Sequence, residues 1–378
     1  MRILHCVTHF SLGGAEEVVL SIVSELHSQA TFGVLGVFDT APNPVGRRMC
    51  AELASLGIPF WTGQPRIGHL TDVLRGSQVL TRCIREFRPS IVHLHTELPE
   101  ACYAAARWSS HRLRGMRVVR TIHNTRYWSG KERVGRLVDR AIGASRIIAV
   151  SRGASAAFAA FRDCEADAPE VIHNGVKIQP AGKRMTRPSD GSVRALFAGR
   201  LEFQKGADIL PTILDRVVLP ANTSLHVEVI GEGSYAGFLA ASSLSSSGVT
   251  LSVHPPLASL CDELPLYDLV LMPSRFEGLG LIAVESLLAG VPVIITDAPG
   301  LIETVPNGYR YVARAGDVDS FADVLTAALH SRASWQAEVD AAQPMCRERF
   351  SRAHMGRRYL AAYEHMLGDM RSAGLVSH

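Results

Sequence analysis

Two glutamates eight residues apart, Glu277 and Glu285, flank the change from a glycine-rich segment to an apolar one. A predicted strand ends near Met272, a glycine-rich loop follows it, and a helix is expected to begin near Leu281. The N–H groups of such a loop and of a helix N-terminus bind anions, and carboxylates accept hydrogen bonds from sugar hydroxyls. The segment therefore predicts an anion site beside two carboxylates that face one crevice.

Glu285 also has a simpler interpretation, because an acid near the start of a helix often only balances the helix dipole. Its neighbours include Val284, Leu287 and Leu288, however, and an unpaired charge among apolar side chains is costly. We therefore favour a ligand-binding role for Glu285.

Two cations follow the first predicted strand of the second half of the chain. Arg200 comes just after a strand expected at Val193–Ala198, and Lys205 follows after a short loop. Cations at the carboxyl end of a strand suit a diphosphate, which carries about two negative charges. For an isolated arginine and lysine, the simpler interpretation is a solvated surface pair.

A second glycine-rich segment, Gly231 to Gly237, superficially resembles a dinucleotide-binding fingerprint. Its glycine spacing is wrong by one residue, and no acid stands between Glu232 and Asp262 to hold a nicotinamide ribose. We therefore favour a glycine turn between a strand and a helix over a dehydrogenase site.

Histidines in the predicted strands Ile91–His95 and Val118–His123 are further candidates for a functional role. His123 ends a strand expected at Val118–His123, where a surface role is the simpler interpretation. His93 and His95 alternate around Leu94 and therefore share one side of a strand. Metal binding by this pair would need a third ligand, which the sequence does not indicate, so no metal site is predicted.

The composition describes a globular chain that is too long for one ordinary core. The 378 residues are 47% hydrophobic and 20% charged, which indicates two folded domains. The net charge of +3 gives no indication of nucleic-acid binding. Scattered cysteines without a CxxC pair disfavour a disulfide framework or a zinc site and suit a reducing cytoplasm. The N-terminal apolar run is interpreted as a strand and not a signal peptide, and no segment is expected to span a bilayer as a helix.

Short β-branched strands alternate with amphipathic helices, which indicates βαβ units and mostly parallel sheets. In the first half, strands are expected at Ile3–Val7, Phe32–Val37, Ile91–His95, Val118–His123, Ile147–Val150 and Val171–His173, and helices at Ala15–Ser28 and Leu70–Phe87. A polar stretch at 177–192, rich in Pro and Gly, predicts a linker. Beyond it, strands are expected at Val193–Ala198, Leu225–Ile230, Val249–Val253, Leu269–Met272 and Val291–Thr296, with a helix from Ala207 and a helical tail from Gln336.

Taken in order, these segments resemble glycosyltransferase family 4, a group of retaining enzymes with the GT-B fold. Glu277 to Glu285 is similar to the family's E-x7-E motif, and Gly199-Arg200-Leu201 with Lys205-Gly206 is similar to its phosphate-binding segment. Further similarities are Gly13-Gly14-Ala15-Glu16, His123, Ile172–Val176, Ala289–Ile294 and Gly316-Asp317, so the resemblance runs through nearly the whole chain. Leu279, where the family often has an aromatic residue, and Ala298-Pro299-Gly300, where it often has a glycine pair, depart from the pattern and leave the donor sugar open.

The resemblance implies a role for each matching residue. Arg200 and Lys205 would neutralise the departing diphosphate in place of a metal, so no metal or other cofactor is expected. Glu285 would hold the nucleotide ribose. Glu277 would bind the sugar, together with the N–H groups of Gly278, Leu279, Gly280 and Leu281. Gly14 would lie beside the phosphate and His123 near the reacting carbon. Ile230 and His254 would lie near the base.

The implied fold is α/β, with two Rossmann-like doubly wound domains facing across a cleft and a C-terminal helix that crosses back to the N-terminal domain. The expected domains are 1–182 with 352–378, for the acceptor, and 190–350, for the nucleotide-sugar donor. The implied activity is retaining, metal-independent hexose transfer from a nucleotide sugar, most often a UDP-sugar, to a saccharide or glycolipid acceptor in polysaccharide or glycoconjugate biosynthesis. The alternatives are a GT-B phosphorylase or epimerase relative and a non-catalytic sugar-nucleotide-binding protein.

The segment from Arg107 to Arg146 carries eleven Lys or Arg residues and only two acids, with Trp108, Tyr127 and Trp128 among them. Arg133, Arg136 and Arg140 recur at helical spacing and predict one basic helix face. Basic faces attract anionic lipid head groups, and tryptophans suit the membrane interface. One interpretation of this pattern is a cytoplasmic protein that associates peripherally with the inner membrane face. The alternative is an ordinary solvated face whose arginines pair with acids elsewhere in the fold.

Overall fold

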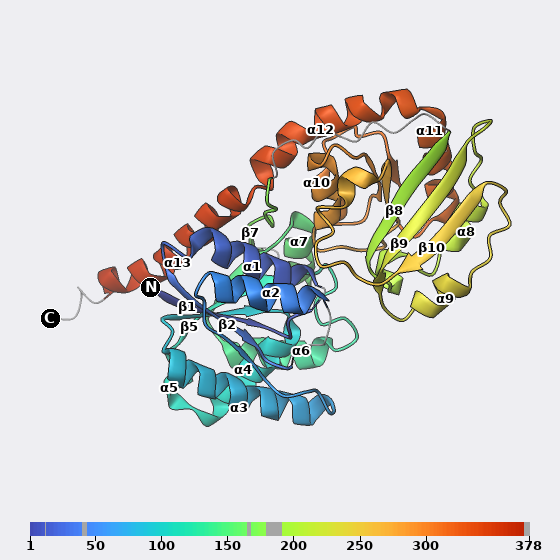
Figure 1. Cartoon of the computed structure of the whole chain (residues 1–378). Helices are drawn as coiled ribbons and strands as arrows, with labels where there is room; N and C mark the ends of the chain where they lie inside the picture. Colours follow the sequence, from blue (N-terminus) through green and yellow to red (C-terminus); the bar gives the residue numbers. More distant parts are fainter. Residues whose placement is uncertain (12, 40–43, 165–167, 179–190, 374–378) are drawn as a thin grey trace. The chain divides into compact units, whose positions relative to one another are not determined.

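The computed structural model describes residues 1–11, 13–39, 44–164, 168–178 and 191–373 (Figure 1). The chain divides into two compact units, Met1–Gly175 with Arg352–His378, and Val176–Ser351. We refer to them as the N-terminal and the C-terminal domain. Most of the predicted linker, 179–190, lies outside the described residues.

The N-terminal domain is built on a seven-stranded parallel sheet in the order β3-β2-β1-β4-β5-β6-β7. Its strands are β1 (Arg2–Val7), β2 (Thr31–Gly36), β3 (Phe60–Thr62), β4 (Ile91–His95), β5 (Arg117–Ile122), β6 (Arg146–Ala149) and β7 (Glu170–Val171). The order reverses between β1 and β4, which is the doubly wound arrangement that the sequence implied.

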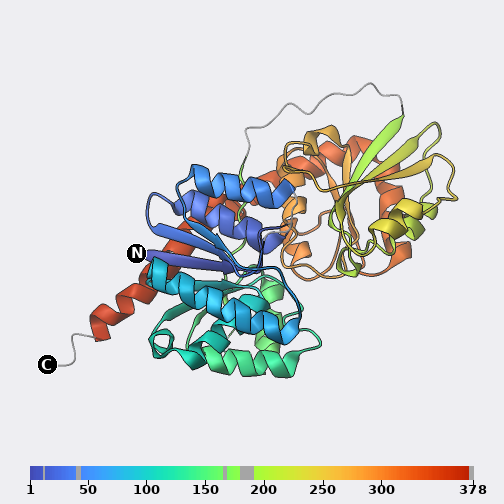
Figure 2. The same ribbon diagram turned by 60° about the horizontal axis from the view of Figure 1, so that its bottom comes forward.

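Helices cover both faces of this sheet, as Figure 2 shows. They are α1 (Gly14–Leu26), α2 (Pro44–Ser55), α3 (His69–Phe87), α4 (Glu97–Ser109), α5 (His111–Arg114), α6 (Glu132–Ile142), α7 (Arg152–Phe161) and α13 (Arg352–Ala373). Helix α4 packs between α3 and α6, whereas α13 packs beside α1 (Figure 1). The C-terminal helix therefore returns to the N-terminal domain, as the resemblance implied.

Strand alternation gives the two faces of the N-terminal sheet different chemistry. On one face, Leu4, Cys6, Val92 and Leu94 join an apolar core with side chains of α3 and α4. The other members of the same strands, among them His5, His93 and His95, point to the opposite face and are also fully buried. A polar layer therefore lies in the interior of this domain.

The C-terminal domain repeats the architecture with a six-stranded parallel sheet in the order β10-β9-β8-β11-β12-β13. Its strands are β8 (Ser192–Arg200), β9 (Ser224–Glu232), β10 (Val249–His254), β11 (Leu269–Met272), β12 (Val293–Thr296) and β13 (Val312–Ala313). Its α-helices are α8 (Leu210–Asp215), α9 (Ala236–Ala241), α10 (Leu281–Leu288), α11 (Val318–His330) and α12 (Trp335–Arg349). Here the strand order reverses between β8 and β11.

Every predicted strand is present, but several boundaries differ. His123 lies outside β5, β12 begins at Val293 and not Val291, and α8 begins at Leu210 and not Ala207. Two edge strands, β3 and β13, were not predicted, because three and two residues are too few to show a period of two.

Candidate functional site

The predicted donor residues of the C-terminal domain gather where the strand order reverses. Arg200 is the last residue of β8, Lys205 ends the 3-10 turn Phe203–Lys205, and Glu277 lies in the loop between β11 and α10. Strands β8 and β11 are neighbours, so both loops leave the same edge of the sheet. In open α/β sheets this edge is where ligands bind.

Lys205 and Glu277 form an ion pair in which Nζ lies 2.6 Å from Oε1. The Glu277 side chain is buried, and that of Lys205 is mostly buried. Ser274 Oγ donates a second hydrogen bond to the same carboxylate oxygen at 2.9 Å. The sequence analysis treated the lysine as a phosphate ligand and the glutamate as a sugar ligand, and it did not predict their mutual contact.

Two residues that the sequence analysis did not single out hold the loops together. Gln204 Nε2 donates to the Phe276 carbonyl at 3.2 Å, and the Arg275 N–H donates to the Gln204 carbonyl at 2.9 Å. Arg200 Nη2 in turn donates to Gln204 Oε1 at 3.0 Å, although the Arg200 residue as a whole is exposed. No local pattern marks Gln204, because its partners in the other loop, Arg275 and Phe276, lie more than 70 residues away.

Glycines allow these loops to approach one another closely. Gly280 caps α10 with a φ of +85°, and a Cβ there would lie 2.5 Å from Leu301 Cδ1. Gly300 also has a φ of +85°, and a Cβ there would lie 2.6 Å from the Glu277 carbonyl oxygen. Alanine would be strained at both positions, so the loop that presents Glu277 depends on them.

The remaining C-terminal residues of the predicted site lie close by in the fold. Glu285 is half-buried on α10, four residues after the helix begins at Leu281. Leu279 is buried, so a donor contact at that position would go through the main chain. Ile230 and His254 are register partners on β9 and β10; Ile230 is buried and His254 is exposed.

Glycines of the segment from Gly231 to Gly237 have a structural explanation. A Cβ on Gly231 would overlap the Gly199 carbonyl, and one on Gly233, whose φ is +154°, would lie 2.5 Å from the Leu201 carbonyl oxygen. These glycines therefore allow the ends of β8 and β9 to come together, which supports the glycine-turn interpretation over a nicotinamide site.

In the N-terminal domain, His123 follows β5 and belongs to a chain of three histidines. Its Nε2 lies 2.8 Å from Nδ1 of His95, and Nε2 of His95 lies 3.0 Å from Nδ1 of His5. Desolvation lowers the pKa of His5 and of His123 to about 3 and lowers the pKa of His95 well below its ordinary value. The rings are therefore neutral at physiological pH.

A second set of hydrogen bonds ties His93 to α13. Nδ1 of His93 lies 2.8 Å from the Tyr363 hydroxyl, and Nε2 lies 2.7 Å from Thr121 Oγ1, which itself lies 3.2 Å from the Tyr359 hydroxyl. The helix that returns from the C-terminal end of the chain thus closes over the polar layer of the sheet.

The sequence analysis found no third ligand beside His93 and His95, but the structure supplies one. His5 faces His93 across the β1–β4 register, and the three histidines offer ring nitrogens within 4.8 Å of one another. Both ring nitrogens of His93 and His95 already have hydrogen-bond partners. A metal ion could bind there only by displacing those partners, so the arrangement favours the hydrogen-bonded form.

Gly14, the other predicted donor residue of this domain, is the first residue of α1. It is exposed, and a Cβ there would meet no atom within 4 Å. Nothing within the described chain therefore requires a glycine at this position, and the space is open to a ligand.

The basic segment from Arg107 to Arg146 does not form a single surface. Arg120 is fully buried and binds Glu100, Asp139 and Tyr127, and Arg146 pairs with Glu170. Tyr127 and Trp128 are buried, so the expectation of a tryptophan at a membrane interface is wrong for Trp128. The exposed members include Trp108, Arg133, Arg136 and Arg140.

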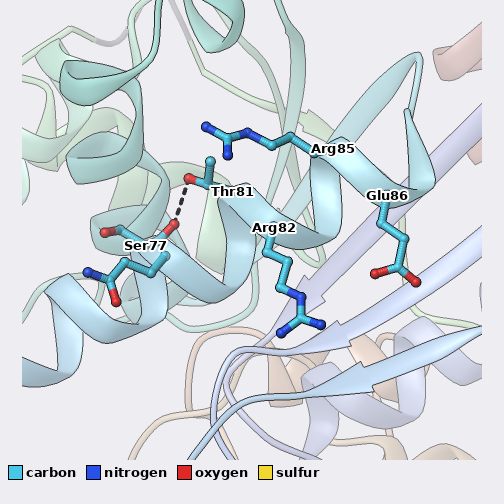
Figure 3. A pocket seen from close by; sticks show the side chains of 6 residues that line it. Ser77, Thr81, Arg82, Arg85 and Glu86 are labelled. Carbon is cyan, nitrogen blue, oxygen red and sulfur yellow. Dashed lines mark hydrogen bonds between the residues drawn. The ribbon is translucent and has the colours of Figure 1, made fainter.

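A shallow hollow lies along α3, far in sequence from the predicted site (Figure 3). Its lining residues are Ser77, Gln78, Thr81, Arg82, Arg85 and Glu86. The Ser77 hydroxyl donates to the Leu74 carbonyl and the Thr81 hydroxyl to the Ser77 carbonyl, both at 2.7 Å. No residue of the predicted site lines this hollow, so we do not assign the active site to it.

Comparison with family models matches each domain separately. The model described as Glycosyltransferase Family 4 matches residues 12–179, and the model described as Glycosyl transferases group 1 matches residues 192–331. The two matches follow one another along the chain and include every predicted site residue.

Curated relatives match parts of the chain. The D-inositol 3-phosphate glycosyltransferase of Streptosporangium roseum is 33% identical over 187 residues, which cover 44% of this chain and 42% of that protein. A glycogen synthase of Mycobacterium tuberculosis is 30% identical over 179 residues, which cover 46% of this chain and 42% of that protein. The chain thus spans about half the length of the curated relatives it matches.

Solved structures match over nearly the whole chain. HepE of Anabaena in complex with UDP-glucose matches with a TM-score of 0.74 and 20% sequence identity. The match covers 97% of this chain and all of that chain. Sucrose-phosphate synthase of Thermosynechococcus elongatus has a TM-score of 0.76 and 14% identity, with 98% of this chain and all of that chain covered. At these identities the likeness shows the shared fold.

Proposed function

This chain belongs to the GT-B glycosyltransferases of family 4, and we propose that it transfers a hexose from a UDP-sugar to a saccharide or glycolipid acceptor with retention of configuration. The observation that carries the proposal is the ion pair of Lys205 with Glu277 at the strand-order reversal of the C-terminal domain, where Arg200 binds the same loop through Gln204. The HepE complex with UDP-glucose, which has the same fold, supports the choice of uridine nucleotide.

The chemistry follows from the charges at that edge of the sheet. When the bond between the anomeric carbon and the diphosphate breaks, negative charge develops on the leaving oxygen. Arg200 and Lys205 would stabilise that charge by direct contact, which is the task that a bound metal ion performs in other transferases. We therefore propose that turnover requires no metal.

The ion pair between Lys205 and Glu277 suggests how the two residues would respond to the donor. In the ligand-free protein the carboxylate keeps the ammonium charge in place and partly neutralised. A bound diphosphate would compete for the ammonium group, and Glu277 would then be available to a sugar hydroxyl. Glu285, farther along α10, would bind the ribose hydroxyls.

A panel of nucleotides and nucleotide sugars tests the donor proposal. A ligand that binds only the folded state stabilises it by about RT ln(1 + [L]/Kd), so the correct nucleotide should raise the melting temperature most. We expect UDP and UDP-hexoses to stand out from GDP, ADP and their sugars. A melting temperature that responds to none of them would contradict donor binding altogether.

Product analysis tests the reaction itself. With the stabilising donor and a mixture of saccharide acceptors, the anomeric proton coupling in the product reports whether configuration is retained. Transfer with inversion would contradict the retaining proposal. Binding without release of UDP under any acceptor condition would favour the non-catalytic binding protein, and a requirement for phosphate as acceptor would favour the phosphorylase.

We propose in addition that a lipid-linked or otherwise anionic acceptor is met at the inner membrane face. Support comes from α6, which exposes Val134 and Leu137 together with Arg133, Arg136 and Arg140. Such a helix combines apolar side chains with cations that attract anionic head groups. None of the helices described is long and apolar enough to cross a bilayer.

Co-sedimentation with vesicles tests this membrane proposal. Binding to vesicles rich in anionic lipid at low salt should exceed binding to neutral vesicles and should fall in a variant carrying Arg133→Gln, Arg136→Gln and Arg140→Gln. Equal sedimentation with and without anionic lipid would contradict it and would favour a soluble acceptor.

A further inference from the structure

The chain of three histidines in the N-terminal domain ends in different surroundings at its two ends. Nε2 of His5 is buried and has no hydrogen-bond partner within the described residues. His123, at the other end, is partly exposed, and no hydrogen bond of its Nδ1 occurs within the described part of the chain. His5, at one end of the row of histidines, is therefore closed off from solvent, and His123, at the other end, can reach a ligand or solvent.

A neutral imidazole has one N–H and one lone pair, so the middle ring constrains both neighbours. His95 uses both nitrogens, and it must donate in one direction and accept from the other. The hydrogen bonds along the three histidines can therefore run in only two directions. In one, all three rings carry their proton on Nδ1; in the other, all three carry it on Nε2.

The three rings are neutral for reasons that the geometry makes plain. His5 and His95 are fully buried, and neither they nor His123 forms an ion pair among the described residues. A charged ring at His5 or His95 would lack both solvent and a counter-ion. Burial accordingly lowers the pKa of each ring.

The two directions differ at His5, the end that is closed off from solvent. If every proton sat on Nε2, the Nε2–H of His5 would be buried without an acceptor. If every proton sits on Nδ1, His5 has only an unpaired lone pair there, and the outermost N–H belongs to His123, where an acceptor can approach. Buried donors without a partner are rarer in proteins than under-satisfied acceptors.

We propose that His5 and His95 are positioning residues that fix His123 in its Nδ1–H form, so that His123 presents a hydrogen-bond donor to the ligand. Each bond then runs outward: His5 Nδ1–H donates to His95 Nε2, and His95 Nδ1–H donates to His123 Nε2. The Nδ1–H of His123 is left to donate to an oxygen atom, such as a sugar hydroxyl or a phosphate oxygen.

The consequence for turnover rests on the proposed function, whereas the tautomer does not. As a hydrogen-bond donor of fixed orientation, His123 would bind a donor-sugar oxygen and could not act as a base through Nδ1. His93 is outside this chain, because its nitrogens bond to Tyr363 and Thr121.

Nitrogen NMR on the ligand-free full-length protein, labelled with ¹⁵N-histidine, tests the proposal directly. Two-bond proton–nitrogen correlations distinguish the protonated from the unprotonated ring nitrogen of each histidine. We expect His5, His95 and His123 all to show a protonated Nδ1 and an unprotonated Nε2. A protonated Nε2 on His123 in the wild-type spectrum would overturn the proposal without need of any variant.

Variants separate positioning from general structure. His95→Phe should release His123 into a mixture of tautomers and lower kcat about 10- to 100-fold, as is usual when a hydrogen-bond partner that orients a functional histidine is removed. The affinity for UDP should stay unchanged. Tyr363→Phe, an equally buried substitution that removes only the hydroxyl bonded to His93 Nδ1, is the matched control and should leave the His123 tautomer as in the wild type. An equal tautomer change in both variants would overturn the proposal.

Zinc provides the counter-test. We expect added Zn²⁺ to leave the histidine spectrum of the native protein unchanged. Stoichiometric loss of the Nδ1 protons of His5 and His95 on addition of Zn²⁺ would overturn the proposal in favour of a metal site. If the tautomers are as expected but no nucleotide binds, the proposed function fails while the positioning inference stands.

Discussion

Nζ of Lys205 lies 2.6 Å from Oε1 of Glu277, although 72 residues separate them in the chain. One follows β8 and the other follows β11, and these strands are neighbours at the reversal of strand order. The pair therefore joins the two loops of the proposed donor site and holds an ammonium group beside a carboxylate. A diphosphate that binds here has to draw the lysine away from a partner it already has.

We expect Lys205→Met to lower kcat/KM by about 10²–10³, because one charge-assisted contact to the leaving group commonly contributes about 2.7–4 kcal/mol. Steady-state kinetics with the donor found in the nucleotide panel measures the loss. Lys177→Met, which removes the same charge at an exposed position, is the control. Since Glu277 loses its partner, circular dichroism should confirm that the variant folds. Near wild-type turnover by folded protein would remove Lys205 from the mechanism.

Glu285→Ala should weaken UDP binding and reduce turnover while leaving the fold intact, because a ribose contact requires the carboxylate and the half-buried position tolerates a small side chain. Calorimetric titration with UDP is the direct measurement. The matched control is Glu348→Ala, an exposed glutamate on α12. Unchanged UDP affinity in the Glu285 variant would contradict its assignment.

Activity should persist in excess EDTA if the side chains of Arg200 and Lys205 supply, as proposed, the positive charge that the leaving diphosphate requires. Turnover is compared before and after chelation, and again after a divalent ion is returned. Complete loss that Mg²⁺ or Mn²⁺ restores would show that a metal is part of the reaction.

Stability should fall as the pH is lowered from about 6.5. An unfolded histidine has a pKa of about 6.5, whereas burial lowers that of His5 to about 3, so between these values the unfolded chain binds the extra proton. Each such histidine destabilises the fold by up to about 1.4 kcal/mol per pH unit in that window.

Urea unfolding at several pH values between about 5 and 7.5 measures this effect. The carboxylates with lowered pKa, such as Asp139 and Glu228, lose their contribution to folding stability only at lower pH. Their protonation therefore does not obscure the effect of the histidines on stability between these pH values. His5→Phe should flatten the dependence. An unfolding midpoint that does not change between pH 7.5 and 5 would refute the prediction.

Arg120→Met should destabilise the N-terminal domain by about 3–5 kcal/mol, because it leaves the buried carboxylate of Glu100 without its cation. Adding Glu100→Gln should recover part of the loss, since the uncompensated charge is then gone. Urea unfolding followed through the N-terminal domain measures both variants. Arg114→Met, at an exposed position, should change stability by less than about 0.5 kcal/mol. Equal losses in the single and double variants would contradict the charge explanation.

Local sequence was sufficient for all strands but β3 and β13, for the two-domain α/β architecture and for the family. Strands such as Ile91–His95 and Leu269–Met272 have the same bounds in the structure, because a β-branched run between polar or glycine-rich turns depends on few distant contacts. The residues proposed to bind the donor were found in the same way, since a phosphate-binding loop needs its glycines, cations and acids at fixed short spacings.

Tertiary structure alone decided which of these residues meet. His5 faces His93 because β1 pairs with β4 in a register that neither strand specifies by itself, and a shift of one residue would send His5 to the apolar face. Arg120 looked like one cation of a basic surface, yet alternation along β5 turns it inward toward Glu100 and Asp139. Contacts of this kind join residues tens to hundreds of positions apart, and only the packing of the sheets and of the returning helix α13 fixes them.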